Sequence, residues 1–322
     1  MQVIVSRNVN DALILGLKAV KQEGMLRDSR NGPVRVFESP VTTVYERPDE
    51  RVVFFPERDA NPFFHLMEGL WMIAGRNDVE WISRFNSSIA NYSDDGITFH
   101  GAYGYRWRKH FGMDQLEIIS ELLRKNPDDR RIVLQMWDPK VDLNRDGKDF
   151  PCNTAIKFRI VDGRLDMTVE NRSNDMIWGA YGANAVHFSM LQEYMAAKIG
   201  VKLGYYWQVS TNFHSYISTF EKHESLLDRI PTSPYHHGVT PFPMVNVNIS
   251  IWEEDLEIFM EAGDSVLGYR DPFFKRVAVP MMRSYKAFKE KRYQSAISIL
   301  EDDCAADDWS RAGVEWIQRR VK

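Results

Sequence analysis

One cysteine stands where two predicted strands would bring it beside an arginine. Cys152 lies in Phe150-Pro151-Cys152-Asn153-Thr154, at the entrance of the first strand, and the second strand runs into Arg172-Ser173-Asn174-Asp175. A neighbouring guanidinium lowers the pKa of a thiol and also binds phosphate or carboxylate through paired hydrogen bonds. The pattern therefore fits a nucleophilic thiolate beside an anion-binding arginine. Two simpler interpretations stay open: a small buried apolar Cys152, and an ordinary salt bridge between Arg172 and Asp175.

The two strands are predicted to form a β-hairpin. Apolar and polar residues alternate over 156–160 and again over 165–169, with the turn-forming pair Asp162-Gly163 between them. A hairpin brings the residues before its first strand close to those after its second. Cys152 and Arg172 are therefore expected to be neighbours.

The remaining elements follow from periodicity and from glycine and proline signals. Apolar residues recur with a helical period over 11–23, 62–75 and 184–199, ending at Gly24, Gly75 and Gly200. Alternation predicts further strands over 34–44, 132–137, 205–209 and 245–251. The segment from Val277 to Lys322 is mainly helical and charged. The chain has no internal repeat or linker, so these helices and strands together predict an α+β fold with helices packed on a large mixed or antiparallel sheet.

Composition excludes several kinds of partner. With 41 Lys and Arg against 45 Asp and Glu, the net charge is −4, so no nucleic-acid polymer is expected to bind nonspecifically. Only two cysteines occur, Cys152 and Cys304, too few for a disulfide framework or a four-thiolate metal site, and no metal is predicted. The start of the chain lacks a secretory pattern, and no apolar run of about 20 residues is present, so neither membrane nor export is expected. We predict a cytoplasmic protein.

Several short motifs follow one another along the chain. They are Glu68-Gly69-Leu70-Trp71, Gly101-Ala102-Tyr103-Gly104, Trp107-Arg108, Asp129-Arg130-Arg131, Pro151-Cys152, Arg172-Ser173-Asn174-Asp175, Gly179, Asn184, and Trp207 leading to His214 and Tyr216. Alone, each has a simpler interpretation, such as a solvated charge cluster or a core tyrosine. Taken in order, they resemble the thymidylate synthase family, which includes the phage deoxynucleotide hydroxymethylases.

The resemblance implies a role for each matching residue. Cys152 matches the thiolate that adds to pyrimidine C6, which makes C5 nucleophilic toward the cosubstrate 5,10-methylenetetrahydrofolate. The implied phosphate ligands are Arg172, Ser173 and an arginine of the early loop, Arg30 or else Arg27, with Arg130 and Arg131 reaching across from the partner in a homodimer. Glu68 matches a carboxylate that organises proton transfer, and Tyr103 a hydroxyl near the C5 proton. Asp175, Trp71 and Gly179 match the folate-binding side, Asn184 the base-reading amide, and His214 with Tyr216 the pair at the sugar 3′-hydroxyl of a pyrimidine deoxynucleotide monophosphate.

Departures from the synthase pattern favour a different reaction. Asn153 replaces the usual histidine after the nucleophile, and the stretch 84–93 lacks the tryptophan that shields the exocyclic methylene while hydride arrives. The chain also continues past Pro280, which suggests a catalytic domain over 1–280 and a helical extension over 281–322. We therefore predict C5 hydroxymethylation by water, with dUMP slightly favoured over dCMP. Reductive methylation, and a non-catalytic nucleotide- or RNA-binding homologue, are the alternatives.

Overall fold

The computed structural model describes residues 1–266 and 268–321, and its centre is a mixed six-stranded sheet. The strand order is β1-β4-β9-β7-β6-β5, with parallel pairs β1–β4 and β9–β7 and antiparallel pairs elsewhere. The strands are β1 (Gln2–Ser6), β4 (Val41–Tyr45), β5 (Val133–Gln135), β6 (Asn153–Val161), β7 (Arg164–Asn171) and β9 (Lys202–Ser210). The predicted hairpin is confirmed as β6 and β7.

A second, four-stranded sheet forms one edge of the molecule. Its order is β2-β3-β10-β8, built from β2 (Met25–Arg27), β3 (Val34–Val36), β10 (Phe213–Tyr216) and β8 (Asn174–Asp175). The prediction of one strand over 34–44 is wrong, because the chain changes sheets between β3 and β4. Pro40 precedes β4 and has no backbone N–H to continue a ladder.

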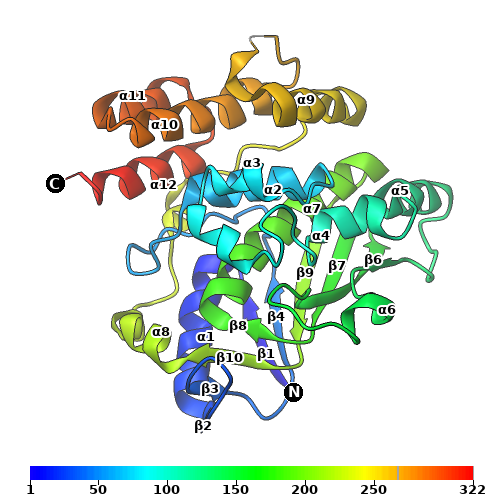
Figure 1. Cartoon of the computed structure of the whole chain (residues 1–322), viewed down its shortest axis with the longest axis vertical. Coiled ribbons are helices and arrows are strands. Elements are labelled where there is room, and N and C mark those ends of the chain that lie inside the picture. The colour runs from blue at the N-terminus through cyan, green and yellow to red at the C-terminus, as the bar shows by residue number, and fades with distance from the viewer. Residues whose placement is uncertain (267, 322) are drawn as a thin grey trace.

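Helices stack in layers on one side of the large sheet (Figure 1). Helices α1 (Val9–Glu23) and α7 (Asn184–Ile199) pack on the strands, and α2 (Pro62–Ile73) packs on α7. The predicted helices are confirmed here with nearly the expected bounds. Smaller helices border this layer: α3 (Val79–Ser83), α4 (Tyr103–Tyr105), α5 (Gln115–Lys125), α6 (Pro139–Asp142) and α8 (Ile217–Lys222).

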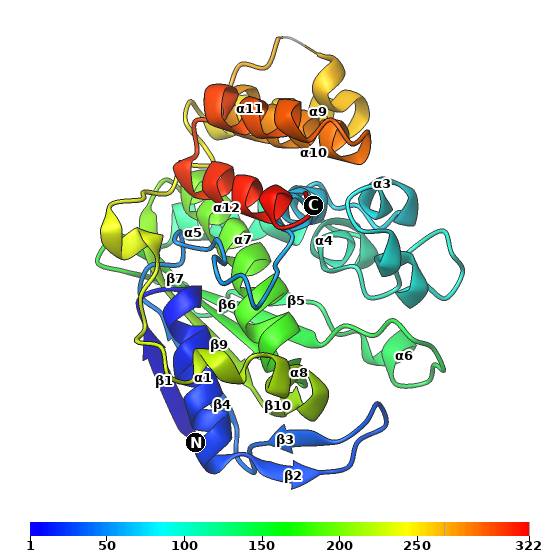
Figure 2. The same ribbon diagram turned by 90° about the vertical axis from the view of Figure 1, so that its left-hand side faces the viewer.

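The C-terminal helices form an outer layer over α2 (Figures 1 and 2). They are α9 (Ile249–Ala262), α10 (Val279–Lys289), α11 (Tyr293–Asp303) and α12 (Asp307–Gln318). The Trp316 ring of α12 lies edge-on to Phe63 of α2 at 5.6 Å between centroids. Tyr235 donates a hydrogen bond to the buried carboxylate of Asp308 at 3.0 Å. The tail is thus packed directly on the helix that carries Glu68.

The strand predicted over 245–251 is wrong. Asn248 caps α9 instead, because its side chain accepts a hydrogen bond from the backbone N–H of Ile251 at 2.9 Å. Trp252, Leu256 and Phe259 then bury one helical face. The capping residue and the 3.6-residue period that follows it outweigh the short run of alternating residues.

Candidate active site

A cavity of about 510 Å³ opens beside Cys152. Glu68 and Tyr103 line it with Cys152, and much of the remaining wall is aromatic: Phe64, Trp71, Tyr92, Phe99 and Phe150. Flat apolar walls with a few polar groups suit planar ring systems. The structure therefore brings together the predicted nucleophile, carboxyl and hydroxyl from three separate parts of the chain.

The hairpin places Arg172 against the nucleophile. The backbone N–H of Arg172 donates to the Cys152 carbonyl at 2.9 Å, and its Nη2 lies 3.9 Å from Sγ. Burial raises the pKa of the Cys152 thiol, and Arg172 offsets only part of that shift. The predicted lowering by Arg172 is thus right in sign, but burial outweighs it. The thiol therefore stays protonated at neutral pH.

Tyr103 holds the loop that carries the cysteine. Its hydroxyl oxygen accepts hydrogen bonds from the backbone N–H groups of Cys152 at 3.0 Å and Asn153 at 3.2 Å. Burial raises the Tyr103 pKa, so the hydroxyl keeps its proton. Its O–H is left to donate into the cavity.

Glu68 is a buried carboxyl on α2 facing the same cavity. Burial raises its pKa to about 8, and its Oε2 lies 3.3 Å from Nε2 of His187 on α7. A carboxyl that is protonated near neutral pH can both donate and accept a proton. His187 was not predicted from the sequence. Its position three residues after Asn184, on the same helix face, is the signal that could have found it.

Asn184 belongs to a chain of amides at the start of α7. Asn153 Nδ2 donates to Asn184 Oδ1 at 3.2 Å, and Asn184 Nδ2 donates to Asn174 Oδ1 at 3.0 Å. The residues between Gly179 and Asn184 lie in the π-helical segment η3 (Met176–Ala183), whose path kinks at Tyr181 and Gly182. At Gly182, a Cβ would lie 2.7 Å from Arg58 Nη2.

Asp175 and the sugar-binding candidates lie together on the small sheet. Asp175 pairs in register with His214, and its Oδ1 accepts hydrogen bonds from the backbone N–H groups of Ile177 and Trp178. Its Oδ2 is buried without a hydrogen-bond partner among the described residues, and burial raises its pKa. The His214 ring lies edge-on to Tyr216 at 5.4 Å between centroids.

The other predicted ligands lie on two segments near the small sheet. Ser173 and Gly179 lie on the chain that follows β7, and a Cβ on Gly179 would lie 2.5 Å from Asn174 Oδ1. Arg30 is exposed in a loop whose Asn31 contacts the Tyr216 hydroxyl at 3.4 Å, whereas Arg27 pairs with Glu38. This favours Arg30 as the early-loop arginine.

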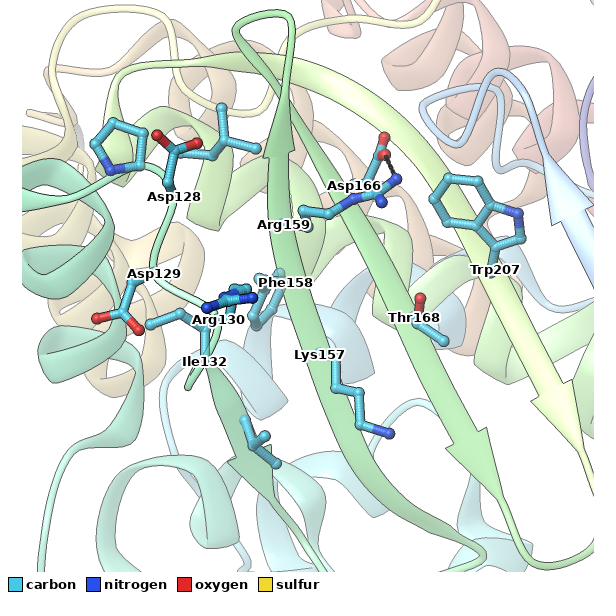
Figure 3. Close-up of a pocket in the computed structure, with 13 residues that line it drawn as sticks. Asp128, Asp129, Arg130, Ile132, Lys157, Phe158, Arg159, Asp166, Thr168 and Trp207 are labelled. Atoms are coloured by element: carbon cyan, nitrogen blue, oxygen red, sulfur yellow. Dashed lines mark hydrogen bonds and ion pairs between the residues drawn. The ribbon is translucent and has the colours of Figure 1, made fainter.

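Arg130 and Arg131 do not line the cavity of their own chain. Arg130 borders a hollow of about 750 Å³ on the open face of β5, β6, β7 and β9, with Lys157, Arg159 and Trp207 (Figure 3). The Arg131 side chain is 81% exposed and pairs with Asp129 at 2.7 Å. Both arginines are therefore exposed at the surface, outside the cavity that Cys152 lines.

Two further groups beside the site were missed. Asp149 lines the cavity and accepts a hydrogen bond from the Gly101 N–H at 2.8 Å; burial raises its pKa. Arg58 is buried, donates to the Ile177 carbonyl at 2.9 Å and stacks on Trp178 at 4.3 Å. Both follow turns without a periodic pattern, so no sequence signal marks them.

Comparison with known proteins decides the family. The sequence pattern described as "Thymidylate synthase" matches residues 17–258. The chain belongs to the thymidylate synthase family. Within this family, it is 55% identical to a deoxyuridylate hydroxymethyltransferase of Pseudomonas phage M6, over 99% of this chain and 95% of that protein. A deoxyuridylate hydroxymethyltransferase of Bacillus phage SP01 is 36% identical over 63% of this chain and 56% of its own. A putative thymidylate synthase of Methanothermobacter marburgensis is 36% identical over 42% and 59%.

Among residues 1–266 and 268–321, no helix is long and apolar enough to cross a membrane. The same part of the chain contains no cluster of His, Cys, Asp and Glu that could hold a metal ion.

Proposed function

We propose that this thymidylate synthase family enzyme hydroxymethylates C5 of dUMP, with 5,10-methylenetetrahydrofolate as one-carbon donor and water as the source of the hydroxyl. One observation carries the proposal: the Cys152 thiol, Glu68 and Tyr103 line one cavity, in a chain that resembles a deoxyuridylate hydroxymethyltransferase over almost its full length. The aromatic walls of this cavity suit the stacking of a pyrimidine and a pterin.

In this proposal each residue has a separate task. Cys152 adds to C6, and the bond to sulfur breaks again when product forms, so the thiolate is regenerated. The Tyr103 hydroxyl faces the C5 proton, and Glu68 handles protons near the pyrimidine carbonyl. Arg172, Ser173 and Arg30 bind the phosphate, His214 and Tyr216 the 3′-hydroxyl, and Asp175, Trp71 and Gly179 the folate side.

Water is the preferred final nucleophile because no tryptophan comes from the 84–93 segment. Asn86, Ile89 and Tyr92 line the cavity instead. Tyr92 is 64% exposed, so it stands at the cavity rim and leaves a route for water. The same ring is the feature that favours the second candidate, reductive methylation, if it closes over bound folate. Trp81, another aromatic residue near this segment, lies at a different hollow.

We also propose a homodimer formed through the open sheet face. Tyr205, Val133 and Val161 are exposed apolar side chains on its strands. Arg130 lies at its edge (Figure 3). A partner on this face would bury them and bring Arg130 and Arg131 toward the second phosphate site.

The division into a catalytic unit, 1–280, and an extension, 281–322, also stays a proposal. The boundary falls in the first turn of α10. A cytoplasmic location remains a prediction as well.

Product analysis tests the reaction. The enzyme is incubated with methylenetetrahydrofolate and either dUMP or dCMP in oxygen-18 water, and the nucleotides are analysed by mass spectrometry. We expect a 5-hydroxymethyl product from dUMP that carries oxygen-18, without stoichiometric dihydrofolate. A 5-methyl product matched by dihydrofolate would establish methylation instead, and nucleotide binding without either product would establish a non-catalytic protein.

A further inference from the structure

Glu68 faces a buried histidine that none of the roles above uses. Its Oε2 lies 3.3 Å from Nε2 of His187, and both side chains are largely removed from solvent, with exposed fractions of 16% and 4%. Nε2 forms no hydrogen bond with any of the described residues, and the Glu68 carboxyl oxygen at 3.3 Å is the charged-group contact that the structure gives it. His187 is three residues after Asn184, so α7 directs both side chains to the same side.

The protonation states of this pair are complementary. Burial raises the pKa of Glu68 to about 8 and lowers the pKa of His187 to about 3, so at neutral pH the carboxyl is an acid and the imidazole a neutral base. A hydrogen bond with the backbone of His65 engages the His187 ring. When one nitrogen of a neutral imidazole donates to a carbonyl, the other keeps its lone pair.

The surrounding groups do not compete for this lone pair. The His65 ring lies perpendicular to His187 at 5.9 Å between centroids, and burial lowers the His65 pKa as well. Arg58 acts on His65 by its charge. Tyr103, Cys152 and Asp149 line the same cavity as Glu68.

We propose that His187 is a positioning residue for Glu68: Nε2 accepts a hydrogen bond from the carboxyl O–H and so holds the second carboxyl oxygen toward the cavity. This inference rests on the proposed function of Glu68. A held carboxyl presents one fixed acceptor to water or to the pyrimidine. A carboxyl without this contact rotates, and its proton points into the cavity in part of the molecules.

Kinetics of paired variants test the positioning role. His187→Leu removes the acceptor, and His187→Gln keeps one in the carboxamide oxygen. We expect His187→Leu to lower kcat for 5-hydroxymethyl-dUMP formation by about a hundredfold, as misplacement of a reacting group does, with the dUMP KM nearly unchanged. His187→Gln should recover much of this loss. His65→Leu and His65→Gln are matched controls at an equally buried histidine and should reduce kcat far less.

Infrared spectroscopy tests the hydrogen bond without turnover. The spectrum of wild type minus that of Glu68→Gln should contain a protonated-carboxyl band at neutral pH. The same difference taken in the His187→Gln background should show this band displaced. A displaced band in an enzyme without hydroxymethylase activity would overturn the proposed function and keep the contact. No protonated band, or equal kinetic losses in the His65 and His187 variants, would overturn the inference.

Discussion

Asn153 donates its side-chain amide to Oδ1 of Asn184 at 3.2 Å, so the residue after the nucleophile sets the orientation of the predicted base-reading amide. Asn174 accepts from the other end of Asn184 at 3.0 Å. With both neighbours in place, the carboxamide of Asn184 cannot exchange its oxygen and nitrogen without losing two hydrogen bonds. If Asn184 reads the base as predicted, Asn153 in place of the family histidine is expected to act on base recognition as well as on the nucleophile loop.

Asn184→Asp should shift base preference toward dCMP. The substitution replaces the amide NH₂ group, a donor that suits a uracil carbonyl, with a second oxygen that can accept from the cytosine amino group. We expect the ratio of kcat/KM for dCMP over dUMP to rise by about tenfold, which corresponds to one hydrogen bond. Asn126→Asp, at the exposed end of α5, is the control for added charge. An unchanged ratio would show that Asn184 does not read the base.

Cys152→Ser should abolish turnover and keep nucleotide binding. An alcohol at neutral pH lacks the nucleophilicity of a thiolate, so we expect a loss of several orders of magnitude in kcat and a dUMP dissociation constant close to that of wild type. Cys304→Ser changes the other cysteine, which lies in the tail, and should stay active. Substantial turnover by Cys152→Ser would reject the nucleophile.

Arg172→Gln should make the thiol less acidic. Arg172 lowers the Cys152 pKa against the effect of burial, so its removal shifts the thiol pKa further upward. The pH at which iodoacetamide alkylation of Cys152 is half-maximal should rise by about one pH unit, the low end for an adjacent charge. Arg124→Gln on α5 should leave it unchanged. A fall in this pH after Arg172→Gln would show that Arg172 does not stabilise the thiolate.

Glu68→Gln should stabilise the protein at alkaline pH. The folded-state pKa of Glu68, about 8, is above its ordinary value of 4.5. The neutral Glu68 carboxyl therefore makes its full contribution to the free energy of unfolding below pH 4.5. Wild type loses this contribution as the pH rises to 8, by about 1.4 kcal/mol per pH unit at most. Urea unfolding should show Glu68→Gln more stable than wild type at pH 8, with a smaller gain at pH 5. Glu121→Gln, at an exposed position of α5, is the control: its free energy of unfolding should differ from that of wild type by the same amount at pH 5 and pH 8. A gain for Glu68→Gln that does not depend on pH would contradict a neutral buried Glu68.

Mixed dimers should recover activity if Arg131 serves the partner's site. Cys152→Ser and Arg131→Glu are each expected to be inactive, and subunit exchange creates one site with Cys152 and Arg131 both intact. About a quarter of wild-type activity is expected after random exchange. Cys152→Ser mixed with Glu68→Gln should not recover, because both residues line the same chain's cavity. Lack of recovery with Arg131→Glu, after exchange is verified, would place Arg131 outside the partner's site.

The sequence predicts best where contacts are local. The meeting of Cys152 and Arg172 follows from a hairpin with a strong turn signal, and α7 follows from a helical period that ends at Gly200. Contacts between distant segments leave no such pattern. The approach of His187 to Glu68 depends on how α7 packs against α2, and the split of residues 34–44 between two sheets depends on partners that are far away in sequence. The strand prediction at α9 is wrong because four alternating residues are a weaker signal than the cap at Asn248 and the helical period that follows it.

The π-helical turn before Asn184 has a consequence for relatedness within the family. A residue inserted inside α7 would rotate every later side chain by about 100° around the helix axis. The kink of η3 at Tyr181 and Gly182 precedes the regular helix, so a change in length at this turn would not rotate α7. Enzymes of different chain length can therefore share one arrangement of α7 against the sheet, and a change in length at this turn does not by itself require a new catalytic geometry.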